Sequence, residues 1–556
     1  MKIRHLLTHF ICLLAVLFFT TSNIFGQNTV GLLSYDQAQS YQGYTLFYPH
    51  NQPNVYLINN CGELVHVWVD DADFRPGNTA YLRPDGSLVK AKRNSSVAGD
   101  NIWAGGGGAI VDIVSWDNEL LWSYELNNDS LRLHHDIAPM PNGNILMIAW
   151  ELKSNEEAIA MGRDPETLNQ VVLWPDFIFE INPETDEIVW EWHVWDHLIQ
   201  DFDSTKANYG VISEHNELVD INYDTNDGKS DWMHSNALDY NPELDQIMLS
   251  VPTFSELWVI DHSTTTEQAA SHFGGNVNHG GDLIYRFGNP QTYDKGDSTD
   301  QLLFYQHDTH WTNEFLPPNH PMKGNIVCFN NRLPGYSAVE IFPSSWEMYI
   351  NDYEEFQGSF PPFELENTIT HPDTFSFYST GLSSAQLLPN GNMLMCSGRQ
   401  GYMVELTPSN EIVWEYKTPI RAGFFVSQGE ELELNNNLTF RAFRYPPDYA
   451  AFDGRNLEPQ GVLELDAADN QCERVVPNIN LEEVSLGFFP NPTSGNLHLT
   501  WDNGKIVRID VYDLLGRQHI STTGNGGMKY LDVSHLEPNI YIVNIEGVGS
   551  GRFIVE

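Results

Sequence analysis

Short stretches of alternating apolar and polar residues recur along most of the chain, and each ends in a turn-forming pair. Examples are the turns Pro84-Asp85-Gly86, Pro141-Asn142-Gly143 and Pro389-Asn390-Gly391, each followed by an apolar run. Asn-Gly and Asp-Gly pairs between short alternating segments are signals for β-hairpins. The pattern from about residue 30 to 470 therefore predicts a succession of antiparallel strands.

The strand pattern also repeats on a larger scale. The segment Glu180 to Trp192, with Glu187-Ile188-Val189-Trp190 near its end, has a close copy from Glu405 to Tyr416. Similar units that return along a chain indicate a ring of sheets, and six blades of a β-propeller fit this length best. A two-sheet sandwich is the alternative, but it does not account for the repeated unit. The prediction is an all-β, six-bladed β-propeller over residues 27–474.

Composition limits the partners of such a fold. The chain has 75 acidic and 28 basic residues, a formal net charge of -47. Nucleic acids and anionic membranes bind clustered lysine and arginine, so neither is an expected partner. Hydrophobic residues make up 41% and aromatic residues 12% of the chain, as expected for a globular β protein.

The first 26 residues have the pattern of a secretory signal peptide. Lys2 and Arg4 precede an apolar stretch from Ile11 to Thr20, and Gly26-Gln27 is a suitable cleavage point. No other segment has the eighteen or more apolar residues that span a bilayer. The mature chain is expected to be exported, with no membrane-spanning segment.

Four cysteines remain in the mature chain: Cys61, Cys328, Cys396 and Cys472. They allow three pairings, and the sequence does not choose among them. Cys61 and Cys472 lie near the two ends of the large domain, where a disulfide could fasten a ring. Cys328 and Cys396 lie in hydrophobic strands and are expected to be buried thiols.

Three segments of similar build carry histidines shortly before a turn and a hydrophobic strand. They are His134-His135-Asp136, Asp231-Trp232-Met233-His234-Ser235-Asn236 and Gln306-His307-Asp308. In a closed ring of similar sheets such positions can converge on the axis, so we predict a histidine-lined pocket. Strand alternation turns only one of His134 and His135 inward, and we favour His135.

Two other motifs are expected to be structural. His193 and His197 have the i, i+4 spacing of a metal pair, but the glutamate of a His-Glu-x-x-His site is missing. The Gly105 to Gly108 run lacks the Lys-Ser/Thr of a phosphate loop and is expected to be a flexible segment. No metal site is predicted.

The C-terminal segment closely resembles a known export signal. Residues 485–556, which follow a linker at 475–484, carry Phe489-Pro490-Asn491-Pro492-Thr493-Ser494-Gly495-Asn496 and Val511-Tyr512-Asp513-Leu514-Leu515-Gly516-Arg517. They resemble the type A sorting domain of the type IX secretion system and predict a small β-sandwich. The resemblance implies export across an outer membrane by that machinery, to the cell surface or the medium.

The large domain resembles bacterial arylsulfotransferases, which use no nucleotide sulfate donor. The resemblance rests on the Pro-Asn-Gly-Asn turns and on five further segments: Asp231–Asn236, Tyr285–Pro290, Gln306–Asp308, Ser384–Asn392 and Phe440–Tyr445. It implies that a phenolic sulfate ester gives its sulfuryl group to a histidine and that a phenolic acceptor then takes it, with no cofactor.

By position, the resemblance implies roles for particular residues. His307 matches the nucleophile, and His135, or its neighbour His134, matches the group that exchanges a proton with the phenolic oxygen. His234 and Asn236 match donors to the sulfuryl oxygens.

One family residue is missing. The strand after Asn236 ends in Pro252, where the family has an arginine. Arg286, Arg399 or Arg444 could bind the sulfate from another blade. Without such a residue, the alternative is a non-catalytic secreted propeller that binds glycans or proteins at the cell surface.

Overall fold

The computed structural model describes residues 28–312, 315–467, 472, 487–500, 507–513, 517–524, 527–545 and 549–555. The predicted signal peptide (1–26) and linker (475–484) lie outside these residues. The chain divides into two compact units, Met1–Val475 and Val476–Glu556.

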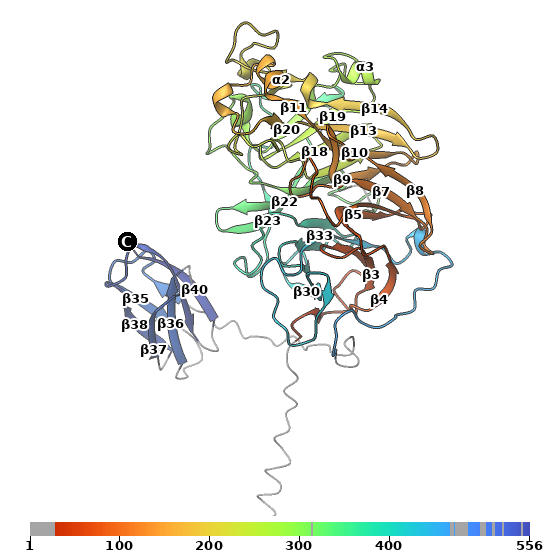
Figure 1. Cartoon of the computed structure of the whole chain (residues 1–556). Helices are drawn as coiled ribbons and strands as arrows, with labels where there is room; N and C mark the ends of the chain where they lie inside the picture. The colour runs from red at the N-terminus through yellow and green to blue at the C-terminus, as the bar shows by residue number, and fades with distance from the viewer. Residues whose placement is uncertain are drawn as a thin grey trace, which may run out of the picture. The chain divides into compact units, whose positions relative to one another are not determined.

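The described part of the first unit contains six sheets of four or five antiparallel strands (Figure 1). In chain order, and from the inner strand outwards, they are β33 (Thr439–Tyr445), β2 (Tyr44–Pro49), β3 (Val55–Asn59) and β4 (Leu64–Trp68); β5 (Phe74–Leu82), β6 (Leu88–Asn94), β7 (Ile110–Val114) and β8 (Leu120–Glu125); β9 (Leu131–Pro139), β10 (Ile145–Glu151), β13 (Asp176–Asn182) and β14 (Glu187–His193); β17 (Ala237–Asn241), β18 (Gln246–Val251), β19 (Glu256–Asp261) and β20 (Leu283–Phe287); β21 (His307–Trp311), β22 (Asn325–Leu333), β23 (Tyr336–Pro343) and β26 (Asn367–Ile369); and β27 (Ser384–Leu387), β28 (Met393–Ser397), β29 (Tyr402–Leu406), β30 (Ile412–Lys417) and β1 (Gly31–Tyr35).

Shorter elements connect these sheets. The strand pairs are β11 (Lys153–Ser154) with β12 (Val172–Leu173), β15 (Leu198–Ile199) with β16 (Val219–Asp220), β24 (Trp346–Glu347) with β25 (Asp352–Tyr353), and β31 (Ile420–Arg421) with β32 (Phe424–Phe425). The helices are α2 (Asn155–Ala160), α3 (Thr266–Ala269), and the 3-10 turns η1 (Pro165–Thr167), η2 (Val194–Asp196), η3 (Ile212–Glu214), η4 (Pro290–Tyr293) and η5 (Ala450–Phe452). Both α-helices begin with a capping box, which satisfies N–H groups at the helix start.

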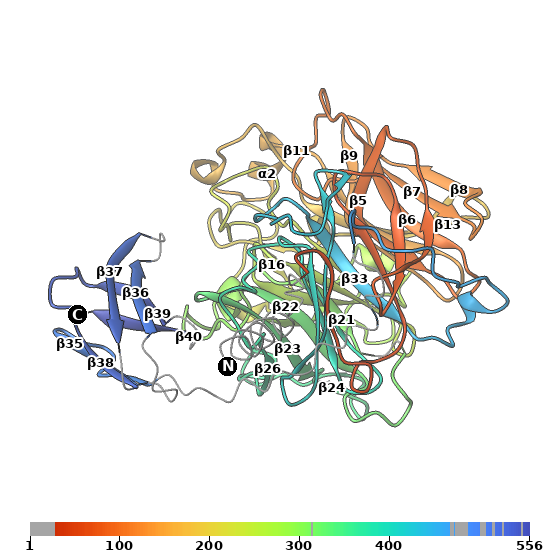
Figure 2. The same ribbon diagram turned by 90° about the horizontal axis from the view of Figure 1, so that it is seen from below.

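The inner strands of the six sheets form a ring. Going round, β5 lies next to β9, β9 to β17, β17 to β21, β21 to β27, β27 to β33, and β33 again to β5. Figure 2 shows β33 beside β5. The two ends of the unit are exchanged, because β1 pairs with β30 and β33 pairs with β2. The all-β, propeller-like prediction is confirmed.

Carboxylates on the inner strands join each sheet to the next. Each accepts a hydrogen bond from a backbone N–H of the neighbouring inner strand, at 2.7–2.9 Å. The pairs are Asp136 with Leu238, Asp239 with Trp311, and Asp308 with Ala385. A buried N–H without a partner is costly, so these carboxylates fix the relative height of adjacent inner strands.

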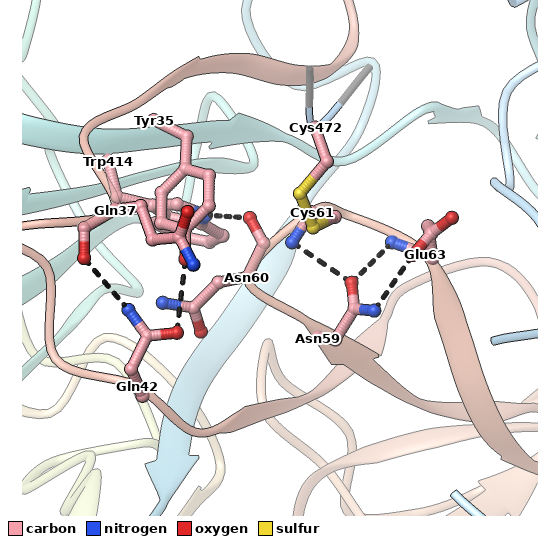
Figure 3. The surroundings of a disulfide bond; sticks show 9 residues. All are labelled: Tyr35, Gln37, Gln42, Asn59, Asn60, Cys61, Glu63, Trp414 and Cys472. Atoms are coloured by element: carbon pink, nitrogen blue, oxygen red, sulfur yellow. Dashed lines mark hydrogen bonds between the residues drawn. A yellow bond between two sulfur atoms is a disulfide. The ribbon is translucent and has the colours of Figure 1, made fainter. Parts of the chain in front are cut away.

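A disulfide closes the first unit. Cys61, which follows β3, is bonded to Cys472, and their Cα atoms are 5.1 Å apart (Figure 3). The Asn59 side chain accepts hydrogen bonds from the N–H groups of Cys61 and Glu63, which holds this turn in place. Cys328 and Cys396 are free and buried. The expected roles of all four cysteines are borne out.

Removing this bond should lower stability, because it spans 411 residues and restricts the unfolded chain. The Cys61→Ser, Cys472→Ser double variant is expected to lose about 2–5 kcal/mol of unfolding free energy. Urea unfolding of the variant and of wild type, each with and without reductant, measures the loss. Equal midpoints for oxidised wild type and the variant would contradict the expectation.

A second tie between sheets involves a charged histidine. The two ring nitrogens of His262 lie 2.7 Å from Asp245 and 3.0 Å from Glu180, so the histidine joins the sheets of β18 and β13. Burial by itself would lower the pKa of His262, but the two carboxylates outweigh it and raise the pKa to about 9.

This pair predicts a pH-dependent contribution to stability. A histidine with a raised folded-state pKa stabilises fully below its unfolded pKa, about 6.5, and the contribution is lost as pH rises through about 9. His262→Gln is expected to cost about 2–3 kcal/mol at pH 6 and clearly less at pH 10. Urea unfolding at both values tests this, with the exposed His215→Gln as control. A cost that does not change with pH would exclude the charged pair.

The second unit is a small β-sandwich, as predicted. One sheet has β34 (Gly487–Phe489), β35 (Asn496–Thr500) and β38 (Met528–Asp532), and the other has β36 (Val507–Asp513), β37 (Gln518–Gly524), β39 (Asn539–Ile545) and β40 (Gly549–Val555). Apolar side chains of both sheets form one buried core. Among the residues described above, none of the helices has the length and apolar character needed to cross a bilayer.

Candidate active site

The three histidines predicted to converge do meet. The ring centroids of His135 and His234 are 4.5 Å apart. His135 and His307 each lie 6.3 Å from the ring of Phe440. His234 and His307 lie 6.3 and 6.0 Å from the ring of Tyr305. Residues from β9, β21, β33 and the segment before β17 thus surround one small space at the centre of the ring.

Local irregularities in the strands aim these side chains. The pairing of β9 with β10 shifts register around His135, and the pairing of β21 with β22 shifts register just after His307. His135 and His234 have φ of 49° and 56°, in the left-handed region. Such conformations cost about 1–3 kcal/mol and persist where surrounding structure imposes them.

His307 is buried, and its neighbours determine its protonation. Its Nδ1 lies 2.7 Å from Oδ1 of Asn331, whose amide nitrogen donates to the carbonyls of Ser379 and Leu382. The amide is therefore oriented with its oxygen towards the imidazole, and the imidazole proton is on Nδ1. The lone pair of Nε2 accepts a hydrogen bond from the N–H of Leu382 at 3.1 Å.

The surroundings of His307 keep it neutral. Burial lowers its pKa to about 3, and the charges of His234 and Arg441 act in the same direction. At neutral pH the side chain is therefore an uncharged imidazole with a directed lone pair on Nε2, which is the form that acts as a nucleophile.

His234 has the opposite electrostatic setting. Its Nδ1 lies 2.5 Å from a carboxylate oxygen of Asp231. Burial acts to lower the pKa of His234, but the charges of Asp231 and Asp176 outweigh it and raise the pKa above its ordinary value. His234 can thus carry a positive charge in a site where His307 cannot.

His134 and His135 differ in their surroundings. His134 stacks on Trp150, with centroids 4.1 Å apart, and its Nε2 lies 3.4 Å from Asp176. Its Nδ1 is 2.9 Å from Nδ1 of His135. Burial, helped by the neighbouring histidines, holds the pKa of His135 well below its usual range. His135 faces His234, whereas His134 packs behind it.

The glycine run has a specific place beside His135. A Cβ atom on Gly106 would lie 2.0 Å from Nε2 of His135, and Gly106 has a φ of 86°. Both facts require glycine at this position. The run therefore lets the backbone approach the histidine, a role that the expectation of a flexible segment did not include.

Asn236 is buried, and its amide is already engaged. Its nitrogen donates to the carbonyl of Gln306 at 2.8 Å, immediately before His307. In this structure Asn236 therefore holds the segment that carries the nucleophile candidate.

Two of the three candidate arginines are committed elsewhere. Arg286 is fully buried, pairs with Glu256 at 2.6 Å and donates to backbone carbonyls. Arg444 is also fully buried, pairs with Glu405 and lies over the Trp414 ring. Both side chains hold the walls between strands.

Arg399 lies beside the histidines. A Cβ on Gly381 would be 3.4 Å from Nη2 of Arg399 and 3.9 Å from Cε1 of His307, so the two side chains flank the same glycine. An arginine that the sequence did not single out, Arg332, lies over the ring of Tyr305 at 3.5 Å from its centroid. These are the mobile-side-chain cations nearest to the histidine cluster that the contacts identify, and Arg332 is exposed.

A further arginine joins the two strands that carry His135 and His307. Nη2 of Arg441 lies 2.7 Å from Asp136, and its Nε lies 2.8 Å from Asp308. Its Nη1 donates to the hydroxyl of Tyr81. Burial opposes the charge of Arg441, but the two carboxylates outweigh it and raise its pKa, so the residue stays cationic.

A separate cavity lies beyond this network. It has a volume of about 540 Å³ and is lined by residues that follow the histidine segments along β9, β17 and β21, including Ile137, Leu238 and Trp311. Arg441 and Asp308 also line it, but none of the three central histidines does.

Fold and site together define an all-β, propeller-like protein with a central histidine cluster. Comparison with known families agrees: residues 111–333 match the arylsulfotransferase (ASST) family, and residues 487–556 match the secretion system C-terminal sorting domain. Over these ranges the chain belongs to the two families, and the sorting domain indicates a secreted or cell-surface protein. The first range contains His135, His234 and His307, whereas Arg399 and Arg441 lie beyond it.

Proteins with curated functions include none that matches this sequence. Solved structures with a similar course of the chain include a protein of unknown function from Bacteroides caccae, at 10% identity and a TM-score of 0.37, covering 73% of this chain and 99% of that one. Another is a putative 6-phosphogluconolactonase from Bacteroides fragilis, at 11% identity and a TM-score of 0.33, covering 74% and 99%.

Proposed function

We propose that this protein transfers a sulfuryl group from a phenolic sulfate ester to a phenolic acceptor through a sulfohistidine at His307. The observation that supports this most strongly is the state of His307. It is neutral, its proton is held on Nδ1 by Asn331, and its Nε2 lone pair faces a space shared with two other histidines. A metal ion or a nucleotide has no part in this proposal.

In the first step, Nε2 of His307 attacks the sulfur of the donor. The bond between sulfur and the phenolic oxygen breaks, and the electron pair leaves with that oxygen. The N–H of Leu382, released from the Nε2 lone pair, can then donate to a sulfuryl oxygen. Splitting the transfer at a covalent intermediate replaces one difficult displacement by two easier ones.

In the second step, the oxygen of the acceptor phenol attacks the same sulfur, and the bond to Nε2 breaks. Neutral His135 takes the phenolic proton, since its lowered pKa leaves it unprotonated before this step. In the next cycle it returns that proton to the departing phenol. The net reaction exchanges one sulfate ester and one phenol for another pair, with protons balanced.

Positive charge around the cluster offsets the net negative charge of the chain. Charged His234 lies beside His135, and Arg399 and Arg332 lie at the edge of the cluster. At physiological salt, charges farther away than roughly 8–10 Å are largely screened. The local cations therefore decide whether a sulfate ester binds, and Arg399 takes the place of the arginine that the family has at the position of Pro252.

Arg399→Ala is expected to raise KM for an aryl sulfate about 10-fold to 100-fold, the value of a charge-assisted hydrogen bond of roughly 1.5–3 kcal/mol. The matched control is Arg421→Ala, which removes an arginine paired with Glu430 at an exposed position. Initial rates over a range of donor concentrations provide the measurement. If both variants keep the wild-type KM, Arg399 does not bind the sulfate.

The function itself is tested with a chromogenic aryl sulfate, with and without a phenol acceptor. Release of the chromophore that depends on the acceptor, and an intact mass that increases by one sulfo group when the acceptor is omitted, are the expected results. A folded protein that gives neither result would favour the non-catalytic binding protein, for which the replacement of the family arginine by Pro252 is the supporting observation.

A further inference from the structure

We propose that His197, His272 and Asp282 form a binding site for a divalent transition-metal ion such as zinc. The site is separate from the histidine cluster at the ring centre. It lies where the long insertion between β19 and β20 meets the corner that follows β14, close to α3 (Figure 1).

Three segments bring the ligand atoms together. His197 ends the turn η2, His272 follows α3, and Asp282 immediately precedes β20. Nδ1 of His197 and Nδ1 of His272 lie 2.7 and 2.8 Å from the same oxygen, Oδ1 of Asp282. One ligand atom from each residue lies within 4.8 Å of the other two.

The hydrogen bond on the far side of His197 identifies its lone pair. Nε2 lies 2.8 Å from the carbonyl oxygen of Ala269, which can only accept. A neutral His197 therefore carries its proton on Nε2 and its lone pair on Nδ1. That lone pair faces a carboxylate oxygen, another acceptor, at 2.7 Å. A cation held between the two atoms satisfies both.

Ion pairing without a metal requires a different charge state. His197 and His272 would then both have to be protonated to donate to one oxygen of Asp282, with two positive rings close together. His197 has no exposed surface, while the side chain of His272 is 61% exposed. With a metal ion, both imidazoles are neutral ligands, and the exposed side of His272 leaves room for water as a further ligand.

The surroundings of His197 are those of a supported ligand. Its ring stacks on Trp192, with centroids 5.7 Å apart and planes 6° apart, and Nε1 of Trp192 donates to the carbonyl of Gly281. Metal-bound histidines commonly donate their other N–H to a backbone carbonyl, as His197 does to Ala269. A Cβ on Gly281 would lie 2.7 Å from Nε2 of His197, so only glycine allows this approach.

The donor set determines the class of metal. Two imidazole nitrogens and one carboxylate oxygen suit zinc and similar first-row ions, while calcium and magnesium prefer oxygen ligands. Bonds of roughly 2.0–2.2 Å in a tetrahedral site place ligand atoms about 3.3 Å apart. Binding therefore moves Asp282 outwards by about half an ångström relative to the present distances. The bound ion would fasten the insertion to the body of the ring.

The test uses the full chain, freed of metal with a chelator and dialysed. Titration calorimetry with zinc alone is expected to show one tight site per chain, and thermal unfolding should shift to a higher midpoint. His272→Ala, which changes an exposed side chain, and Asp282→Asn should each weaken binding by about 100-fold or more, beyond the 10-fold to 100-fold cost of losing a supporting contact. His215→Ala, another exposed histidine beside a carboxylate, should bind zinc like wild type.

A His307→Ala variant separates this site from the central cluster, since it should keep the zinc site. Absence of zinc binding by wild type at 100-fold molar excess would overturn the proposal. Unchanged binding in both His272→Ala and Asp282→Asn would overturn it as well, because the ion would then be held elsewhere. Either result leaves the proposed sulfuryl transfer untouched.

Discussion

Replacing His307 by alanine is expected to lower kcat for acceptor-dependent aryl sulfate turnover by about 10⁴-fold or more, in line with loss of a catalytic nucleophile. The reason is structural. His307 alone among the three central histidines has both a fixed Nδ1 proton and an Nε2 lone pair held by a backbone N–H. The variant should also lose the sulfated intermediate seen by intact mass.

The control for this prediction is on the same strand. His310 lies three residues further along β21, and its Nδ1 contacts the backbone carbonyl of Asp308. It lines the separate cavity beyond Arg441, so His310→Gln should keep the activity of wild type. If His307→Ala retained acceptor-dependent turnover, the covalent route through this residue would be excluded. Circular dichroism of both variants shows that the fold is intact.

The second large effect is expected at Arg441. Arg441→Met leaves two buried carboxylates, Asp136 and Asp308, without their shared cation, and breaking a buried ion pair in this way costs about 3–5 kcal/mol. These carboxylates directly follow His135 and His307 in the chain. The histidines therefore lose their relative placement, and kcat should fall together with the free energy of unfolding.

A neutral network separates charge from packing. In Arg441→Met, Asp136→Asn, Asp308→Asn, each asparagine can still accept the backbone hydrogen bond that its aspartate accepts from the next strand. This triple variant should regain most of the lost stability, because no uncompensated charge remains. Urea unfolding of the single and triple variants decides the matter. An Arg441→Met variant as stable as wild type would show that the network contributes little.

Several of these features could be predicted from the chain alone because they depend on near neighbours. Alternation and hairpin turns involve residues two to four apart, so the antiparallel strands and the C-terminal sandwich followed from the sequence. Repetition of the unit then implied a ring, and a ring brings equivalent positions to its axis. This is why His135, His234 and His307 could be grouped before any coordinates.

The protonation of those histidines could not be predicted in the same way. The pKa of His307 falls and that of His234 rises because of burial and of partners such as Asn331 and Asp231. Such partners are identified only when side-chain directions are known. The bulges that aim His135 and His307 likewise break the simple alternation on which strand predictions depend.

The sequence by itself determined the class of fold, the export signals and the residue types at the centre. Only the tertiary structure decided which arginine faces the histidines, that Cys61 is bonded to Cys472, and that Arg441 joins β9 to β21. The physical reason is distance along the chain. Closing the ring brings together residues that are hundreds of positions apart, and local patterns contain no information about such contacts.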